Sequence, residues 1–130
     1  MTEAAVRKSR PKHLNLMQIR LPLPGFVSIL HRVSGAGLFL SLPLLIWLFG
    51  ASLGTAEQLE NFRAVFGNGF VKLVLLGLLW AYLHHFCAGM RFLFLDVHKG
   101  IEFPAARKTA WAVLVMSLSL TLVIGGLVVW

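Results

Sequence analysis

The sequence predicts an all-α membrane protein with three transmembrane helices. Of its 130 residues, 58% are hydrophobic and 13% are charged, and the mean hydropathy is +0.79. Soluble domains contain about 25% charged residues, so this composition is typical of an integral membrane protein. Three uncharged runs, separated by polar segments, are long enough to cross a bilayer as helices. The chain is too short for two domains, and we expect one membrane-anchor domain over residues 1–130.

Residues 1–27 form a basic lead-in of mixed polarity, which suits a segment on the membrane surface or under a soluble partner. A flexible tail explains the composition equally well. Pro11, Pro22 and Pro24 prevent one continuous helix there, because proline lacks a backbone N–H. The lead-in has no apolar run like that of a secretory signal peptide, and it makes a poor mitochondrial transit peptide. We therefore expect a bacterial inner (cytoplasmic) membrane protein.

The first membrane helix is expected over about residues 28–54. It contains most of an uncharged run, residues 33–56, which would be roughly 36 Å long as a helix. Pro43 near the middle should kink this helix, which neighbouring helices in a membrane can tolerate. The polar segment that follows, residues 55–72, is expected to be a connecting loop with at most a short helical turn.

The second membrane helix is expected over about residues 70–95. Residues 73–90 carry no Lys, Arg, Asp or Glu, and would be roughly 27 Å long as a helix. A polar connection over residues 91–108 leads to the third helix, expected over about residues 107–130. The last 22 residues of the chain are uncharged.

Lys and Arg are distributed unevenly between the ends of these helices. Six of the 12 lie in residues 1–32, two lie in residues 55–72, and four lie in residues 91–108. Connections rich in Lys and Arg stay in the cytoplasm. The N-terminus and the second connection are therefore predicted to be cytoplasmic, with the first connection and the C-terminus on the other side.

The net charge of +7 would suggest a nucleic-acid partner in a soluble protein. Here the basic residues gather at the ends of apolar runs, where they set the topology instead. We expect membrane lipid and no nucleic acid as partners. Cys87 is the only cysteine, so no intrachain disulfide is possible and a packing role is favoured.

Two polar clusters are expected to meet near the cytoplasmic end of the membrane helices. The first helix contributes residues spaced i, i+3, i+4 and i+7, which share one face: Ser28, His31, Arg32 and Gly35. On the second helix, His85 lies about 8 Å below the cytoplasmic end, and Arg91 and Asp96 lie just beyond that end. Polar residues at this depth are costly and indicate function.

A haem fits these residues, because neutral imidazole is a common axial ligand of haem iron and guanidinium groups can pair with the propionates. His85 is favoured as the ligand, since it belongs to a stripe of small residues that leaves room for a flat macrocycle: Gly77, Ala81, His85 and Gly89. His84, which shares a face with Trp80, is a second candidate or a neighbour of the haem. The second axial ligand would have to come from another chain, so a heteromeric helical bundle is predicted.

Structural interpretations of the same residues are also open. A lone histidine in an apolar helix is more often a packing residue than a ligand, and a small-residue stripe more often serves helix packing. Arg32 and Arg91 could be basic anchors at the membrane surface. The sequence has no catalytic triad order, zinc-ligand spacing or phosphate-binding loop, so we expect no catalysis by this chain alone.

The block S-I-L-H-R-V-S-G at residues 28–35 and the block H-F-C-A-G-M-R at residues 85–91, followed by Asp96, resemble the cytochrome b556 subunits of succinate dehydrogenase. The lead-in from Arg10 to Pro22 is also similar. The resemblance implies a membrane anchor for an iron–sulfur subunit and a flavoprotein subunit, paired with a second small membrane subunit. It further implies electron transfer from succinate to ubiquinone, with a haem b held between the two membrane subunits.

The resemblance also implies roles for individual residues. His85 matches the axial haem ligand of the family. Ser28 and Arg32 match residues of the quinone site, and Asp96 matches an acidic residue near its entrance. Three residues match positions near the haem propionates: His31, Arg32 and Arg91. Many members have a histidine where this chain has Phe92, which changes the hydrogen bonding expected at the haem edge.

Two other functions remain open from the sequence. The first is a haem-free membrane anchor of a fumarate reductase-like complex, against which the presence of His85 argues. The second is a small oligomeric transporter or channel subunit. That function predicts charges within the membrane helices, whereas the charges here lie at the helix ends.

Overall fold

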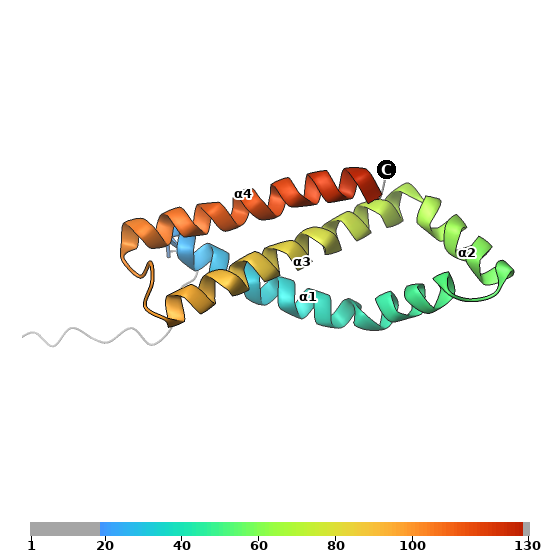
Figure 1. Ribbon diagram of the computed structural model, residues 1–130, viewed down its shortest axis with the longest axis horizontal. Coiled ribbons are helices and arrows are strands. Elements are labelled where there is room, and N and C mark those ends of the chain that lie inside the picture. The colour runs from blue at the N-terminus through green and yellow to red at the C-terminus, as the bar shows by residue number, and fades with distance from the viewer. Residues whose placement is uncertain (1–18, 129–130) are drawn as a thin grey trace, which may run out of the picture.

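The computed structural model describes residues 19–128, which form four α-helices (Figure 1). Three of these helices are long and apolar enough to cross a membrane: α1 (Leu23–Ser52), α3 (Gly69–Asp96) and α4 (Phe103–Val128). The shorter α2 (Ala56–Gly67) connects α1 to α3. The predicted all-α class with three membrane spans is therefore confirmed. The expected surface segment in residues 1–18 lies outside the described residues.

The central helix of the bundle is α3, which packs against both α1 and α4. The start of α1, the end of α3 and the start of α4 lie at the same end of the molecule, on the left of Figure 1. At the other end, α2 extends across from the end of α1 to the start of α3. This arrangement places the two predicted polar clusters, one at the start of α1 and one near the end of α3, side by side.

The first helix begins at Leu23, five residues before the predicted start at about residue 28. Pro22 is the N-cap residue, with extended backbone angles, and Pro24 lies in the first turn. Proline is tolerated there because the first backbone N–H groups of a helix have no partner within the helix. Pro43 lies inside α1 and removes one backbone hydrogen bond, and α1 is visibly curved in Figure 1.

The prediction of a loop between the first two membrane helices is wrong, because α2 is a regular helix of 12 residues. A capping box starts this helix: the backbone N–H of Gln58 donates to Oγ1 of Thr55 over 3.3 Å, and the backbone N–H of Thr55 donates to Oε1 of Gln58 over 2.8 Å. Two aromatic rings on the same face, Phe62 and Phe66, lie 5.0 Å apart between centroids. The Thr-x-x-Gln spacing at Thr55 is visible in the sequence and predicts this helix start.

The connection between α3 and α4 is short and tightly turned. His98 and Gly100 have positive φ angles of 59° and 76°. Glycine adopts such angles freely, whereas histidine does so only occasionally. The connection ends at Phe103, so α4 begins about four residues before the predicted start near residue 107.

Small residues form the buried face of α4, with Ala106, Ala110, Val113, Ser117, Thr121 and Gly125 recurring every three or four positions. Small side chains allow helices in a membrane to approach closely. A side chain at Gly125 would collide with Cδ1 of Leu76 on α3. At the opposite end of the bundle, where α1 begins, the buried core contains Val27 of α1, Ala88 of α3 and Ala110 of α4. These residues lie where α1 and α4 pack against α3.

Candidate functional site

His31 of α1 and His85 of α3 lie face to face. Their ring centroids are 4.1 Å apart and their planes are inclined by only 9°. Both side chains are half-buried. The structure thus brings together the two histidines that helical spacing had placed at the same depth on different helices.

His85 is held by groups from the first turns of α1. Its Nδ1 lies 3.0 Å from the backbone carbonyl oxygen of His31 and 3.4 Å from Oγ of Ser34. The hydroxyl of Ser34 in turn donates to the carbonyl oxygen of His31 over 2.9 Å. Nε2 of His85 has no hydrogen-bond partner within the part of the chain that the structure describes. Ser34 was not among the predicted site residues, although it lies in the same block as His31.

Two glycines make room around this pair of rings. A Cβ atom at Gly35 would lie only 2.7 Å from Cε1 of His85, and a Cβ atom at Gly89 would lie 3.6 Å from Nε2 of His31. By contrast, a Cβ atom at Gly77 would meet nothing within 4 Å. The small-residue stripe on α3 therefore borders the histidine pair at Gly89, while its other end faces open space in this chain.

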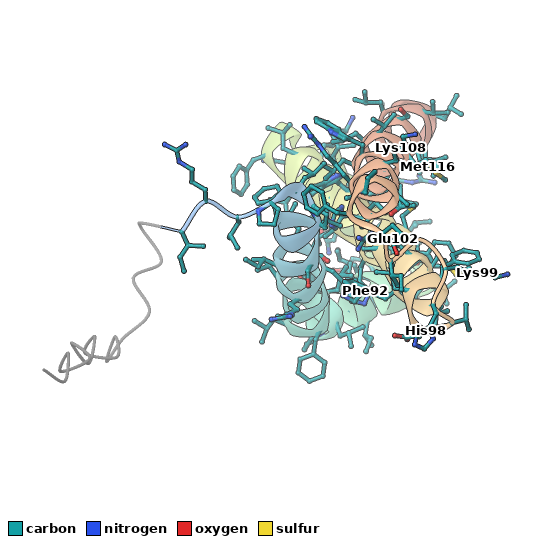
Figure 2. The ribbon with its side chains drawn as sticks, turned by 90° about the vertical axis from the view of Figure 1, so that its left-hand side faces the viewer. Phe92, His98, Lys99, Glu102, Lys108 and Met116 are labelled. Carbon is teal, nitrogen blue, oxygen red and sulfur yellow. The ribbon has the colours of Figure 1, made fainter. Side chains whose placement is uncertain are left out.

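Phe92, near the C-terminal end of α3, borders the histidine pair. Its ring centroid lies 5.1 Å from that of His31, with the planes inclined by 54°. Figure 2 shows Phe92 between α1 and the end of α3. An apolar ring thus lies at the edge of the histidine pair.

His84 has an entirely different environment from His85. Its side chain is completely buried, and its ring centroid lies 5.3 Å from that of Trp80. Both ring nitrogens of His84, and Nε1 of Trp80, are buried without a hydrogen-bond partner in the described chain. Because successive residues of a helix differ by about 100° in direction, His84 points into the packed helices while His85 faces His31.

Among the described residues, Arg91 forms hydrogen bonds with α4 and none with the histidine pair. Its Nε donates to Oγ1 of Thr109 over 3.0 Å, and its NH2 group donates to the carbonyl oxygen of Ala106 over 3.3 Å. The side chain is only 7% exposed, so these bonds replace water. Arg91 also borders a cavity of about 410 Å³ between α3 and α4, which no residue of α1 lines. Lys99 borders the same cavity, although its side chain points away from the bundle in Figure 2.

The three predicted quinone-site residues lie at the same end of the bundle as the histidine pair. Ser28 is half-buried one turn before Arg32 on α1, and Arg32 is exposed. Asp96 is the last residue of α3 and is also exposed. No hydrogen bond or ion pair joins these three side chains within residues 19–128. They share one end of the bundle, and no contact among the described residues brings them together.

The side chains of this site suit a metal ion that is already held by the atoms of a cofactor, and not a bare metal ion. Among the described residues, no three His, Cys, Asp or Glu side chains are grouped closely enough to hold a bare metal ion. A haem needs only one imidazole from this chain, and Nε2 of His85 has no hydrogen-bond partner among the described residues, while Gly35 leaves room for its ring. The residues present therefore fit a haem ligand contributed by α3.

A family model for the succinate dehydrogenase/fumarate reductase transmembrane subunit matches residues 6–124. The chain belongs to this family. It is 34% identical over 122 residues to the succinate dehydrogenase cytochrome b556 subunit of Coxiella burnetii, covering 93% of this chain and 97% of that protein. It is 31% identical to the same subunit of Rickettsia felis, covering 95% and 96% of the two chains, and 31% identical to that of Paracoccus denitrificans, covering 88% of each.

Membership in this family agrees with the three membrane helices. The matched region contains all of α1, α2 and α3, and most of α4. The chain is thus a multi-pass membrane subunit of a succinate dehydrogenase or fumarate reductase complex, and its similarity to cytochrome b556 subunits extends over nearly its whole length.

Proposed function

We propose that this chain is a membrane anchor of a succinate:quinone oxidoreductase, and that it binds haem b and ubiquinone. His85 carries the proposal: it is a half-buried imidazole with a free Nε2, held on α3 against the start of α1 in a chain similar to cytochrome b556 subunits. A b-type haem, when bound, supplies a one-electron carrier within the helical bundle. Its second axial ligand would come from a second small membrane subunit.

The remaining residues near this end of the bundle have supporting roles in the proposal. Arg32 is exposed next to His31, and its guanidinium can pair with a propionate or with a quinone oxygen. His31 stacks on His85 in this chain, so it lies directly beside the proposed ligand. Arg91 and His84 lie on other faces of α3. They could reach a haem only after a rearrangement, which makes them weaker candidates than His31 and Arg32.

Quinone reduction adds two electrons and two protons, so its site must reach both the electron donors and water. Ser28 and Arg32 lie near the start of α1, where a hydroxyl and a guanidinium can donate to a quinone oxygen and stabilise its developing negative charge. The exposed carboxylate of Asp96 lies at the same end, and we assign it to the entrance of the quinone site. We place the iron–sulfur and flavoprotein subunits on this face, which the Lys and Arg distribution predicts to be cytoplasmic. The expected membrane is the bacterial inner membrane.

The haem proposal is tested on the complex purified in detergent. The wild-type complex should show a reduced b-type α-band and a positive pyridine haemochrome assay. His85→Ala should remove this band, because no other imidazole on α3 faces the same side. His84→Leu is the matched control, since it fills the buried space without a ring nitrogen, and it should retain the band. Loss of the band in His84→Leu but not in His85→Ala would show that the ligand is misassigned.

The quinone proposal is tested by comparing two electron acceptors. Arg32→Leu should lower succinate–ubiquinone reductase activity about 100-fold, since it removes a charged donor to the developing oxyanion. Succinate oxidation by a soluble dye should be unchanged, because the dye accepts electrons from the soluble subunits. Ser28→Ala should show the same pattern more weakly. Equal loss of both activities would instead indicate failure of the complex to assemble.

The family also includes fumarate reductase subunits, and a haem-free anchor of such a complex is the alternative. The two functions differ in the haemochrome assay on the wild-type complex. A complex that contains all its subunits and no haem would support the alternative.

A further inference from the structure

We propose that the turn of α1 from His31 to Gly35 orients the imidazole of His85 before any cofactor binds, so that Nε2 is the atom presented to the iron. This inference rests on the proposed haem function and adds the groups that position the ligand. Those groups are the backbone carbonyl of His31, the hydroxyl of Ser34 and the space left by Gly35. None of them bonds the iron.

The contact with the His31 carbonyl determines which ring nitrogen of His85 carries the proton. Nδ1 of His85 lies 3.0 Å from this oxygen. A carbonyl oxygen can only accept a hydrogen bond, so the contact is favourable only when Nδ1 bears the hydrogen. A neutral imidazole has a single N–H, and Nε2 then keeps its lone pair. This tautomer is the one that a ligand bonding through Nε2 requires.

The hydroxyl of Ser34 contacts both the carbonyl oxygen of His31 and Nδ1 of His85. This hydroxyl donates to the carbonyl oxygen of His31 over 2.9 Å, which leaves the lone pairs of Oγ facing Nδ1 of His85 at 3.4 Å. Ser34 is only 7% exposed, so water does not compete for its hydroxyl. The ring Nδ1–H of His85 therefore has two acceptors on α1: the His31 carbonyl oxygen at 3.0 Å and the more distant Oγ of Ser34 at 3.4 Å.

Gly35 allows the ring to reach this position. A Cβ atom there would lie 2.7 Å from Cε1 and 3.1 Å from Nδ1 of His85. Real Cβ atoms do not approach so closely, so an alanine would force the ring of His85 to swing away from the His31 carbonyl. Gly37, two residues later on α1, has nothing within 4 Å of its own hypothetical Cβ atom. The same substitution at the two positions thus separates loss of ring space from a general effect on the helix.

A hydrogen bond to the remote nitrogen of a ligating histidine fixes its orientation and raises its basicity, and its loss typically lowers metal affinity about 10- to 100-fold. A more basic ligand favours ferric over ferrous iron. Weakening the bond from His85 to the His31 carbonyl should therefore weaken haem binding and shift the haem midpoint potential to more positive values. A residue that only supports the fold would change assembly without a correlated change in potential.

The experiment compares four variants of the complete, detergent-purified complex with the wild type: Gly35→Ala, Ser34→Ala, Gly37→Ala and Ser41→Ala. Ser41 is the control for Ser34, because its hydroxyl bonds only to Gly37 of its own helix, over 2.8 Å. The measurements are haem transfer to excess apomyoglobin and a redox titration of the α-band. Gly35→Ala should release haem about 10 to 100 times more readily and have a more positive potential. Ser34→Ala should do the same by about 2- to 10-fold.

The two control variants should match the wild type in both measurements. The inference is overturned if Gly35→Ala and Ser34→Ala also match the wild type. If Gly35→Ala fails to assemble, Ser34→Ala decides alone, since it removes a single hydroxyl and leaves the ring space intact. A wild-type complex without haem would overturn the proposed function together with this inference. Wild-type haem retention and potential in all four variants would overturn the inference alone.

Discussion

At the scale of single residues, His84 and His85 show how far helical spacing predicts a site. The 100° between neighbouring residues was enough to predict different faces for the two rings. It was not enough to predict the partners of His85, which depend on how far α1 is shifted along α3. Val27 and Ala88 belong to the buried core where α1 meets α3, and neither span alone reveals that they come together. Ser34 and the His31 carbonyl were missed for this reason.

Arg91 gives a prediction at the residue scale. Its hydrogen bonds to α4 indicate a role in stability, whereas the sequence predicts a role near the haem propionates. Arg91→Ala removes two charge-assisted hydrogen bonds from a buried position. We expect a loss of about 2 kcal/mol in stability, seen as a lower Tm of the purified complex. Arg107→Ala, at an exposed position in the same part of α4, should change stability by no more than about 0.5 kcal/mol.

The opposite result for Arg91 would also be informative. An unchanged Tm with a shifted haem potential would mean that Arg91 leaves Thr109 and pairs with a propionate in the assembled complex.

At the scale of helices, apolar runs predict the three membrane spans, whereas capping residues indicate where a helix begins. A run without charges identifies the membrane-buried part of a helix but not its ends, which extend into the polar interface. Both α1 and α4 therefore begin earlier than predicted. In the first connection, the polar composition alone predicts a loop, although the segment forms α2. The Thr55–Gln58 capping box satisfies the free N–H groups of a helix start in that same segment.

The small-residue face of α4 gives a prediction at the helix scale. Gly125→Ala should lower the Tm of the complex by the equivalent of about 1 kcal/mol, because the new methyl group displaces the side chain of Leu76. Gly126→Ala is the matched control, since its Cβ atom would meet nothing within 4 Å in this chain. An equal loss in both variants would show that the second face of α4 is covered by another subunit at Gly126.

At the scale of the whole molecule, the sequence predicted the number and order of membrane helices but not how the chain completes a site. Most large apolar side chains remain exposed, including Phe39 and Leu40 of α1. Lipid or partner helices must cover these side chains, and their identity is not encoded in this chain. The predicted quinone residues likewise lie at one end of the bundle without contacts to one another, as expected if partner subunits complete their site.

Orientation in the membrane is the whole-molecule prediction. In a Cys87→Ser background, Glu60→Cys on α2 should react in intact cells with a maleimide that cannot cross the inner membrane, after the outer membrane has been made permeable. Lys99→Cys, between α3 and α4, should react only after the inner membrane is also permeabilised. Both positions are exposed, so accessibility within the fold does not limit labelling. The reverse labelling pattern would place the histidine pair on the periplasmic side.

The pairing of His31 with His85 also bears on the order in which the protein is made. Within the described residues, the ring contacts and hydrogen bonds of these two side chains come from α1 and from α3 up to Phe92. The 26 residues of α4 are synthesised after them, which takes about 1 to 5 seconds at bacterial rates. The proposed ligand and the groups proposed to orient it thus all precede α4 in the order of synthesis. The part that we propose for this chain in holding haem therefore depends on no residue of its last helix.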